Sequence, residues 1–453
     1  SYKNGYNLSS FLGRVNYMYA DRYIATVNIR FDGSSKLGEN NKWGFFPSAS
    51  LAWVMSEEDF MKDIDAIDEF KLRAGYGRTG NQDAISAYNS LLLMGPSGIT
   101  SVNGVPTVTY SYNRNANPDL KWETKNMFDV GVDMAFMNRR LTANIDYYYS
   151  RTEDLLYDYD VPVPPFVHPK LLANLGEMEN SGLEFTVGYS PIRSKDMDLT
   201  ISGNVAYQKN KLLSLSGTYM GQELNAAEYM KLARINGAGF QGGNTYVTYQ
   251  VVGQPLGVFY LPKSNGLIND GLGSYTYNVL NLDDDPNINL NDGGDRYFAG
   301  QAMPKVLMGA NINFRYKSFD IQTQLNGAFG HKIYNGTSLS YMNMNTFPTY
   351  NVLPDAPEKK IFDSTVTDYW LEKGDYVHIA YVTMGYNFDV EKIKNWVNSI
   401  RLTASVNNLY TFTNYSGLSP MINSTTVNGS LGLDDKQFYP LTRTYSLGLS
   451  INF

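Results

Sequence analysis

The sequence contains no cysteine, which excludes disulfide bonds and cysteine-ligated metal sites. It contains no run of ~18 apolar residues, which excludes a transmembrane helix. Its three histidines, His168, His331 and His378, lie far apart without ligand spacing around them, and no G-x-S-x-G sequence occurs. We therefore predict neither a catalytic site nor a histidine-based metal centre, and we do not expect an enzyme.

Positive charge is also scarce. The chain has 37 Lys and Arg against 44 Asp and Glu, a net charge of −7, and no cluster of basic residues stands out. Proteins that bind nucleic acid rely on such clusters to neutralise phosphates. Nucleic acid is therefore not expected as a partner.

Tyrosine is abundant, with 36 Tyr and 22 Phe beside 40 Gly, and the aromatic residues recur in alternation with polar ones. In "SFLGRVNYMYA", Phe11, Val15 and Tyr17 fall on one side and Arg14 on the other, which is the period-two pattern of a strand. Thirteen strands of this kind are predicted, over 10–20, 22–31, 44–55, 69–78, 121–135, 140–151, 180–191, 197–209, 305–317, 319–330, 375–388, 398–410 and 442–453.

The predicted strands are long, and their connections are tight turns, medium links at 56–69 and 389–398, or long segments. Most strands run about ten to thirteen residues, roughly twice the length usual in soluble sheets. At ~3.3 Å per residue and ~40° of tilt they would cover roughly 25–30 Å, the apolar height of a bilayer. Tight turns such as 20–22 alternate with long segments. The long segments, expected to be extracellular loops, are 79–120, 152–179, 210–304, 331–374 and 411–441.

The two faces of these strands differ in chemistry. Aromatic residues gather where strand ends would meet the membrane surfaces: Tyr17, Tyr19 and Tyr23 at one end, and Trp43, Phe45, Tyr147 and Tyr149 at the other. The opposite faces carry Glu123, Lys125, Asp129, Asp133, Asp146, Asp320, Gln322 and Gln324. We predict an all-β, antiparallel transmembrane barrel with a wet lumen. Soluble β-sandwiches or a propeller are the alternative, but they would need shorter strands and no loop asymmetry.

Stretches over nearly the whole chain resemble, in order, the SusC/RagA-type TonB-dependent transporters of Bacteroidetes outer membranes. They include "KLRAGYGRTGNQ" (71–82), "NPDLKWETKNMFDVGVDM" (117–134) and "YPLTRTYSLGLSINF" (439–453). The resemblance implies a barrel of about 22 strands filled by an N-terminal plug, driven through a TonB box and capped by a SusD-like surface lipoprotein. Neither plug nor TonB box is present, so we expect residues 1–453 to be the C-terminal portion of such a barrel, with Ser1 in an extracellular loop.

The longest loop, 210–304, carries the candidate substrate contacts. Its aromatic residues could stack on sugar rings or pack against peptide side chains. The residues predicted to bind substrate are Tyr219, Tyr229, Phe240, Tyr246, Tyr249, Tyr275 and Tyr277, with Tyr260 as a further aromatic in the loop. The alternative is that these rings pack inside the loop or against the lipoprotein lid.

The acidic stretch "NLDDDPNINLNDGGDR" (281–296) is a candidate calcium site, the only cofactor site that we predict. Its hard oxygen donors at suitable spacings are Asp283, Asp285, Asn287, Asp292 and Asp295. Members of the resembled family often have a D-x-N-G-D-G-like loop near this point, but here Pro286 and Asn287 replace the central glycine. A solvated acidic turn is the alternative interpretation.

From the resemblance we expect an outer-membrane active importer of oligomeric nutrients, with glycans as the first candidate cargo. Its partners would be a SusD-like lipoprotein, the TonB complex, outer-membrane lipid and the oligosaccharide itself. An oligopeptide importer of the same family is the main alternative, and a passive porin is a weaker one. A surface hydrolase on the barrel rim would need a catalytic pair that the sequence does not offer.

Overall fold

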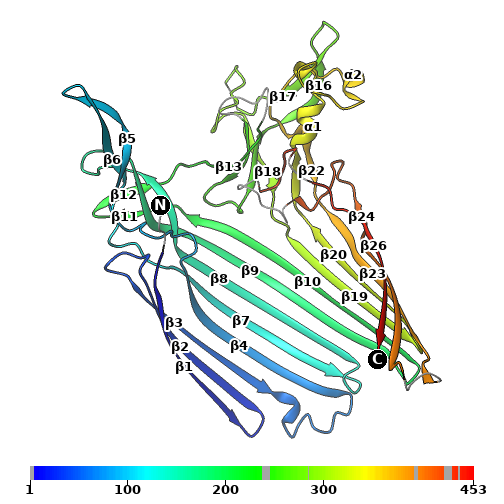
Figure 1. The fold of residues 1–453 in the computed structure, drawn as a ribbon. Coiled ribbons are helices and arrows are strands. Elements are labelled where there is room, and N and C mark those ends of the chain that lie inside the picture. Colours follow the sequence, from blue (N-terminus) through cyan, green and yellow to red (C-terminus); the bar gives the residue numbers. More distant parts are fainter. Residues whose placement is uncertain (1–4, 237–244, 284, 392–395, 423–430, 437–438) are drawn as a thin grey trace. The chain divides into compact units, whose positions relative to one another are not determined.

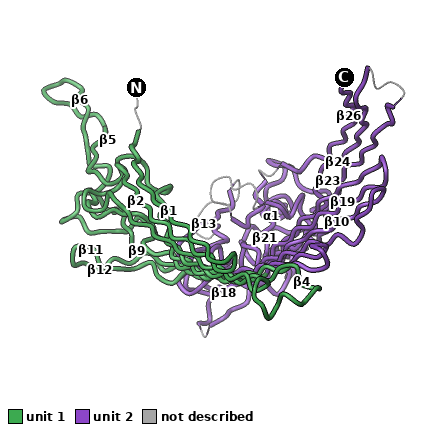
Figure 2. Tube along the Cα trace, turned by 90° about the horizontal axis from the view of Figure 1, so that it is seen from below, with its two compact units in different colours: residues 1–134, 145–183, 210–228 green, residues 135–144, 184–209, 229–453 purple. Residues whose placement is uncertain are grey.

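A computed structural model describes residues 5–236, 245–283, 285–391, 396–422, 431–436 and 439–453, and it consists mostly of strands (Figure 1). No helix in these ranges is long and apolar enough to cross a membrane. The chain divides into two compact units, coloured separately in Figure 2. Unit 1 comprises 1–134, 145–183 and 210–228, and unit 2 comprises 135–144, 184–209 and 229–453.

The prediction of thirteen long strands is confirmed. They form a 13-stranded sheet in the order β1-β2-β3-β4-β7-β8-β9-β10-β19-β20-β23-β24-β26, which ends at β1 and β26 and is therefore open. Their bounds are Leu8–Tyr19 (β1), Tyr23–Ser34 (β2), Trp43–Val54 (β3), Ile67–Asn81 (β4), Glu123–Phe136 (β7), Leu141–Asp160 (β8), Lys170–Arg193 (β9), Met197–Ser214 (β10), Val306–Tyr316 (β19), Phe319–Phe329 (β20), Tyr376–Phe388 (β23), Ser399–Thr413 (β24) and Thr444–Asn452 (β26).

In unit 1 the register places aromatic rings in two rows. Near the tight turn between β1 and β2, the ring of Tyr23 lies 6.5 Å from that of Tyr19 and 6.4 Å from that of Trp53. Near the other end of β2, the rings of Phe31 and Phe45 are 4.7 Å apart. Residues 23 and 31 are separated by about 26 Å along the strand, at ~3.3 Å per residue. That spacing, reduced by strand tilt, suits the apolar band of a bilayer.

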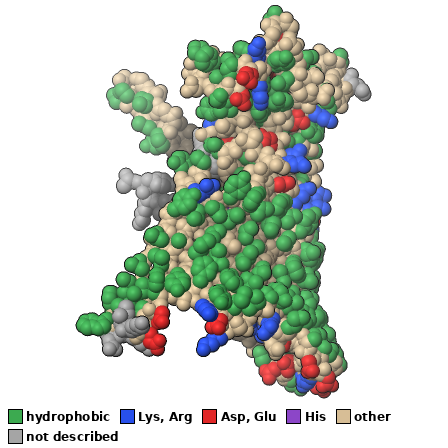
Figure 3. Space-filling view, turned by 90° about the vertical axis from the view of Figure 1, so that its right-hand side faces the viewer, with side chains coloured by type: hydrophobic (Ala, Val, Ile, Leu, Met, Phe, Trp, Pro, Cys, Tyr) green, Lys and Arg blue, Asp and Glu red, His purple; other side chains and the backbone are tan. Residues whose placement is uncertain are grey.

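In unit 2 the antiparallel pairs run from β10–β19 through to β24–β26. One side of β26 exposes the apolar residues Tyr445, Leu447, Leu449 and Ile451. In Figure 3, hydrophobic side chains form a broad band on the face shown, and most charged side chains lie beyond its two ends. An exposed apolar face of this extent is expected of a sheet that meets lipid rather than water.

Some strands continue farther than the alternation predicted. β8 extends to Asp160 and β9 begins at Lys170, so only 161–169 lie between them where the sequence predicted a loop over 152–179. The part of β8 beyond the predicted strand end at residue 151, "TEDLLYDYD" (152–160), falls in the predicted loop. Here the strand ends pack on other protein segments instead of lipid, with Tyr159 and Leu171 in a small buried core.

The long connections contain their own small elements. The strands are β5 (Leu93–Val102), β6 (Val105–Arg114), β11 (Ser216–Tyr219), β12 (Gln222–Asn225), β13 (Met230–Arg234), β14 (Tyr246–Gln250), β15 (Val258–Pro262), β16 (Ser264–Asn269), β17 (Tyr275–Val279), β18 (Arg296–Gln301), β21 (Lys332–Asn335), β22 (Leu371–Lys373) and β25 (Leu433–Asp434). Two short helices, α1 (Gly336–Tyr341) and α2 (Ala356–Lys359), and 3-10 turns at Met55–Glu57, Met344–Thr346 and Asp368–Trp370 complete the described elements.

Candidate functional site

The polar side of the sheet in unit 1 carries a network of charges. Arg73 of β4 donates through Nε and Nη2 to both carboxylate oxygens of Asp133 at 2.8 and 2.7 Å, and through Nη2 to Asp146 at 2.8 Å. Lys71 Nζ lies 2.7 Å from Asp133. A Cβ on Gly131 would lie 2.0 Å from the nearer Asp146 oxygen, so only glycine leaves room for the pair to lie flat on the sheet.

The polar side in unit 2 is largely uncharged instead. Antiparallel register lines up neutral side chains across β10, β19, β20, β23, β24 and β26 in two adjacent rows. The rows are Thr200–Asn313–Gln322–Thr383–Ser405–Ser446 and Ser202–Asn311–Gln324–Tyr381–Asn407–Thr444. Amide and hydroxyl groups both donate and accept hydrogen bonds, so this face can exchange hydrogen bonds with neutral, hydroxyl-rich or amide-rich molecules.

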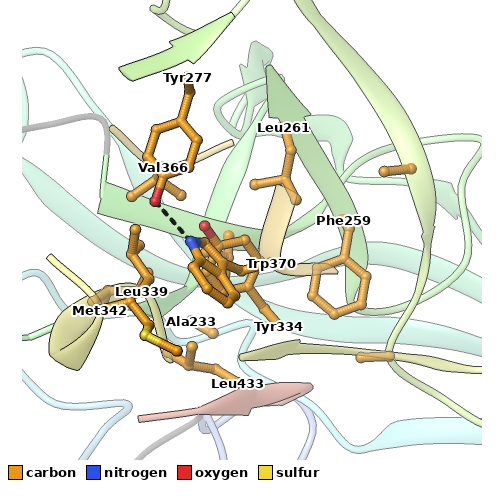
Figure 4. Close-up of a cluster of buried hydrophobic side chains, with 14 of the residues drawn as sticks. Ala233, Phe259, Leu261, Tyr277, Tyr334, Leu339, Met342, Val366, Trp370 and Leu433 are labelled. Atoms are coloured by element: carbon orange, nitrogen blue, oxygen red, sulfur yellow. Dashed lines mark hydrogen bonds between the residues drawn. The ribbon is translucent and has the colours of Figure 1, made fainter. Parts of the chain in front are cut away.

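Three long loops of unit 2 share one hydrophobic core, shown in Figure 4. It includes Phe259 and Leu261 from the first loop, Tyr334 and Trp370 from the second and Leu433 from the third. β21 is the central strand of a small sheet, antiparallel to β22 and parallel to β25. The shared core and sheet make the loops one packed structure.

A second loop sheet, in the order β13-β14-β15-β18, carries a cluster centred on Arg296, whose side chain is fully buried. Arg296 Nη1 donates to the Tyr249 hydroxyl at 2.8 Å, and that hydroxyl donates to Asp292 at 2.9 Å. Burial raises the pKa of Tyr249. The ring of Tyr229 stacks on that of Tyr260 with centroids 4.7 Å apart. The cluster therefore ties β14, β15 and β18 to the acidic stretch 281–296.

The aromatic residues predicted to contact substrate divide into two groups. Tyr219, Tyr249 and Tyr277 are buried in loop cores, where they have no exposed face for a ligand. Tyr277 accepts a hydrogen bond from Trp370 Nε1 at 2.7 Å. The half-buried residues Tyr229, Tyr246 and Tyr275 keep part of their surface accessible. Phe240 lies outside the described residues.

The residues of the predicted calcium site form turns rather than one cage. Asp283 and Asp285 each accept the backbone N–H two residues farther on, and the side chain of Asn287 donates to Asp285. Asp292 already pairs with a protein cation, Lys231, at 3.0 Å. Across the part of the chain that the structure describes, no three His, Asp or Glu side chains are grouped to hold a metal ion. The geometry therefore gives the calcium prediction no support.

Asp295, the last of the five, has a structural role that sequence analysis missed. Its carboxylate is buried and accepts the N–H groups of Leu282 at 2.5 Å and Asn289 at 2.7 Å. These hydrogen bonds lower the pKa of Asp295, because they stabilise the charged form. The carboxylate of Asp295 thus links three positions of the acidic stretch, residues 282, 289 and 295, by hydrogen bonds.

We expect the stretch 281–296 to loosen in acid. Since the pKa of Asp295 is lower in the folded chain, its stabilising contribution is complete above the unfolded value of ~3.9 and disappears as the pH falls through the folded value. Hydrogen exchange at the amides of Leu282 and Asn289 measures this. Asp295→Asn should speed exchange of both amides at pH 7, because a neutral amide oxygen is a weaker acceptor than a carboxylate. Unchanged exchange in the variant would contradict the role assigned to Asp295.

For the charged pairs on the strand faces, sequence analysis predicted the acidic members but not the basic ones. Alternation placed Asp133, Asp146 and Asp320 on the polar side, but their partners Arg73 and Arg401 were not identified. Arg401 donates to the two oxygens of Asp320 at 2.7 and 2.8 Å. The period-two position of each arginine within its strand was the signal that could have identified it.

Long antiparallel strands with aromatic rows, one apolar face, one polar face and long structured loops define an outer-membrane β-barrel protein. Residues 1–409 match the family described as TonB dependent receptor-like, beta-barrel. The chain therefore belongs to the TonB-dependent receptor family and forms part of its outer-membrane barrel, which confirms the resemblance found in the sequence.

Two curated relatives are similar over the whole chain. TonB-dependent receptor P3 of Formosa agariphila is 33% identical, and TonB-dependent receptor SusC of Bacteroides thetaiotaomicron is 29% identical. The match covers 100% of this chain in both cases but 46% and 44% of those proteins, so the chain spans about half the length of these relatives. The RagAB peptide transporter structure shares the fold, with a TM-score of 0.78 and 20% identity over 99% of this chain and 48% of that one.

Proposed function

We propose that the chain is the wall and loop portion of an active outer-membrane importer of oligomeric nutrients, with glycans as the cargo. Membership of the TonB-dependent receptor family carries the proposal. The relatives contain as many residues again beyond the matched part, and we assign the plug and the TonB contact to that portion of the full-length protein.

The polar rows of unit 2 support a glycan as cargo. They expose amide and hydroxyl groups across six neighbouring strands, with the charged pair Asp320–Arg401 at the edge of the rows. Sugar hydroxyls are neutral donors and acceptors, and they match such a face without requiring a counter-charge. The half-buried rings of Tyr229, Tyr246 and Tyr275 add aromatic surface in the loops.

Growth experiments on the full-length receptor test the cargo. Deleting the receptor gene should abolish growth on one class of oligosaccharide and leave growth on its monosaccharides unchanged, and loss of TonB should have the same effect. Restoring the wild-type gene is the control. Loss of growth only on oligopeptides would assign the peptide alternative, and uptake that continues without TonB would indicate a passive porin.

A surface for the partner lipoprotein is offered by the β5–β6 hairpin in unit 1. Residues 84–113 contain no charged side chain, although 18% of the whole chain is charged. The register places Ile99 opposite Val108 and Pro96 opposite Tyr110, and Ile99 and Tyr110 are well exposed. An isolated two-stranded hairpin is marginally stable in water, and exposed apolar patches mark interaction sites. We propose that the lipoprotein covers this face.

Charge introduced on the two sides of the hairpin should have different effects. Ile99→Lys places an ammonium on the apolar side and should reduce co-purification of the lipoprotein with the full-length receptor at least about tenfold, because a buried charge costs several kcal/mol. Thr107→Lys, on the opposite side, should leave co-purification close to wild type. Equal effects, or none from Ile99→Lys, would remove the hairpin from the interface.

A further inference from the structure

The apolar side of β1–β4 is hollowed. A depression of about 420 Å³ lies in unit 1, and its apolar lining includes Tyr17, Tyr23, Ala25, Leu51, Trp53 and Ala74. The register explains the shape, because it sets Ala25 between Tyr17 and Leu51, with Ala74 on the far side of Leu51, so that small and large side chains alternate across the strands. Arg73 also borders the hollow, but its guanidinium is held by Asp133 and Asp146.

The carboxylate of Glu58 lies at the end of the hollow that Tyr23 and Trp53 line. Tyr23 donates its hydroxyl hydrogen to Glu58 at 2.6 Å, and Trp53 Nε1 donates to the same oxygen at 3.0 Å. Arg22 donates to the other oxygen at 2.8 Å. The two aromatic residues therefore belong both to the apolar lining and to the polar edge, the arrangement that Trp and Tyr adopt where lipid tails meet headgroups.

The turn beyond this edge is acidic but carries exposed apolar side chains. Residues 57–65 contain five carboxylates and one lysine, Lys62. The side chain of Asp59 is 88% exposed and pairs with Lys62 at 3.3 Å. In the same turn Phe60 and Ile64 are 63% and 43% exposed. A turn of this composition has surplus negative charge for a headgroup and apolar side chains that can enter the interface.

We infer that the hollow binds one acyl chain of a phospholipid whose headgroup carries an amine, with the ammonium against the carboxylates of residues 57–65. An apolar lining next to an aromatic row suits an acyl chain. The surplus carboxylates attract an ammonium and repel an anionic headgroup. A second copy of the chain is disfavoured, because a two-fold interface would bring the two acidic turns together. The inference rests on the membrane-facing sheet and is independent of the proposed cargo.

Native mass spectrometry of the full-length receptor tests the inference, with phosphatidylethanolamine and phosphatidylglycerol of matched chains as probes. The wild-type receptor should retain one phosphatidylethanolamine through delipidation, in at least about tenfold preference over phosphatidylglycerol. Ala74→Leu and Ala25→Leu fill the hollow and should each reduce retention about tenfold. Ala404→Leu, an equal enlargement at an exposed position on β24, should not. The double variant Asp59→Lys/Asp63→Lys should reverse the headgroup preference.

Three results would overturn the site: no lipid retained by the wild type, equal retention in the filled variants, or a preference for phosphatidylglycerol. Unfolding temperatures of all variants, measured in the same detergent, show whether each one is folded. If Ala74→Leu does not assemble, Ala25→Leu carries the same comparison. A receptor dimer that dissociates in either filled variant, without retained lipid, would assign the hollow to a second copy instead.

Discussion

Replacing Phe259 with alanine should unfold the shared loop core of unit 2 while the long strands remain paired. Phe259 is a fully buried member of that core, and removing a buried phenylalanine side chain costs about 3–5 kcal/mol. The small sheets around it have strands of only two to six residues, so the loops depend strongly on the packing of this core. The long strands satisfy their backbone hydrogen bonds with one another and do not depend on this ring.

Limited proteolysis and heat resistance, measured together, check this expectation. Phe259→Ala should be cut rapidly between residues 210 and 304, while the remaining barrel still resists heat and detergent. Phe298→Ala is the matched control, since it removes the same ring from an exposed position on β18. Loss of the barrel and the loops in a single step would show that the loop core is not a separate folding unit.

Gly38→Ala should separate two loops of unit 1. The N–H of Gly38 donates to the Leu120 carbonyl at 2.8 Å, and a Cβ at residue 38 would lie 2.0 Å from the carbonyl oxygen of Pro118. Because the obstacle is backbone, it cannot rotate away as a side chain could. Beside this contact, Leu37 packs with Trp122 in a buried cluster. We expect a loss of about 3 kcal/mol in local stability, at the upper end for overpacking.

Hydrogen exchange at the amide of residue 38 measures that loss directly. Gly13→Ala in β1 is the control, because a Cβ there meets nothing within 4 Å. We expect unchanged or slower exchange in the control and much faster exchange in Gly38→Ala. Equal exchange in the two variants would mean that the loops can move apart without cost.

The strands were determined by the sequence itself. Period-two alternation depends only on neighbouring residues, so the predicted strand 319–330 is observed as Phe319–Phe329 and 375–388 as Tyr376–Phe388. The same alternation placed Asp133 and Asp320 on the polar side. In a sheet between lipid and a polar interior, the alternation must be kept closely. A residue on the wrong face would expose an apolar side chain to water or a charge to lipid.

Contacts between distant residues were decided only by the tertiary structure. Trp370 donates to Tyr277 across 93 residues of sequence, and this contact buries a ring that was predicted to meet substrate. Arg401 reaches Asp320 across 81 residues, and Asp292 meets Lys231 across 61 residues. Such pairs depend on strand register and loop packing, and both result from many weak interactions between residues that are distant in sequence. The alternation of neighbouring residues contains no information about these interactions. It therefore predicts which face of the sheet a residue occupies but not the partner that it meets.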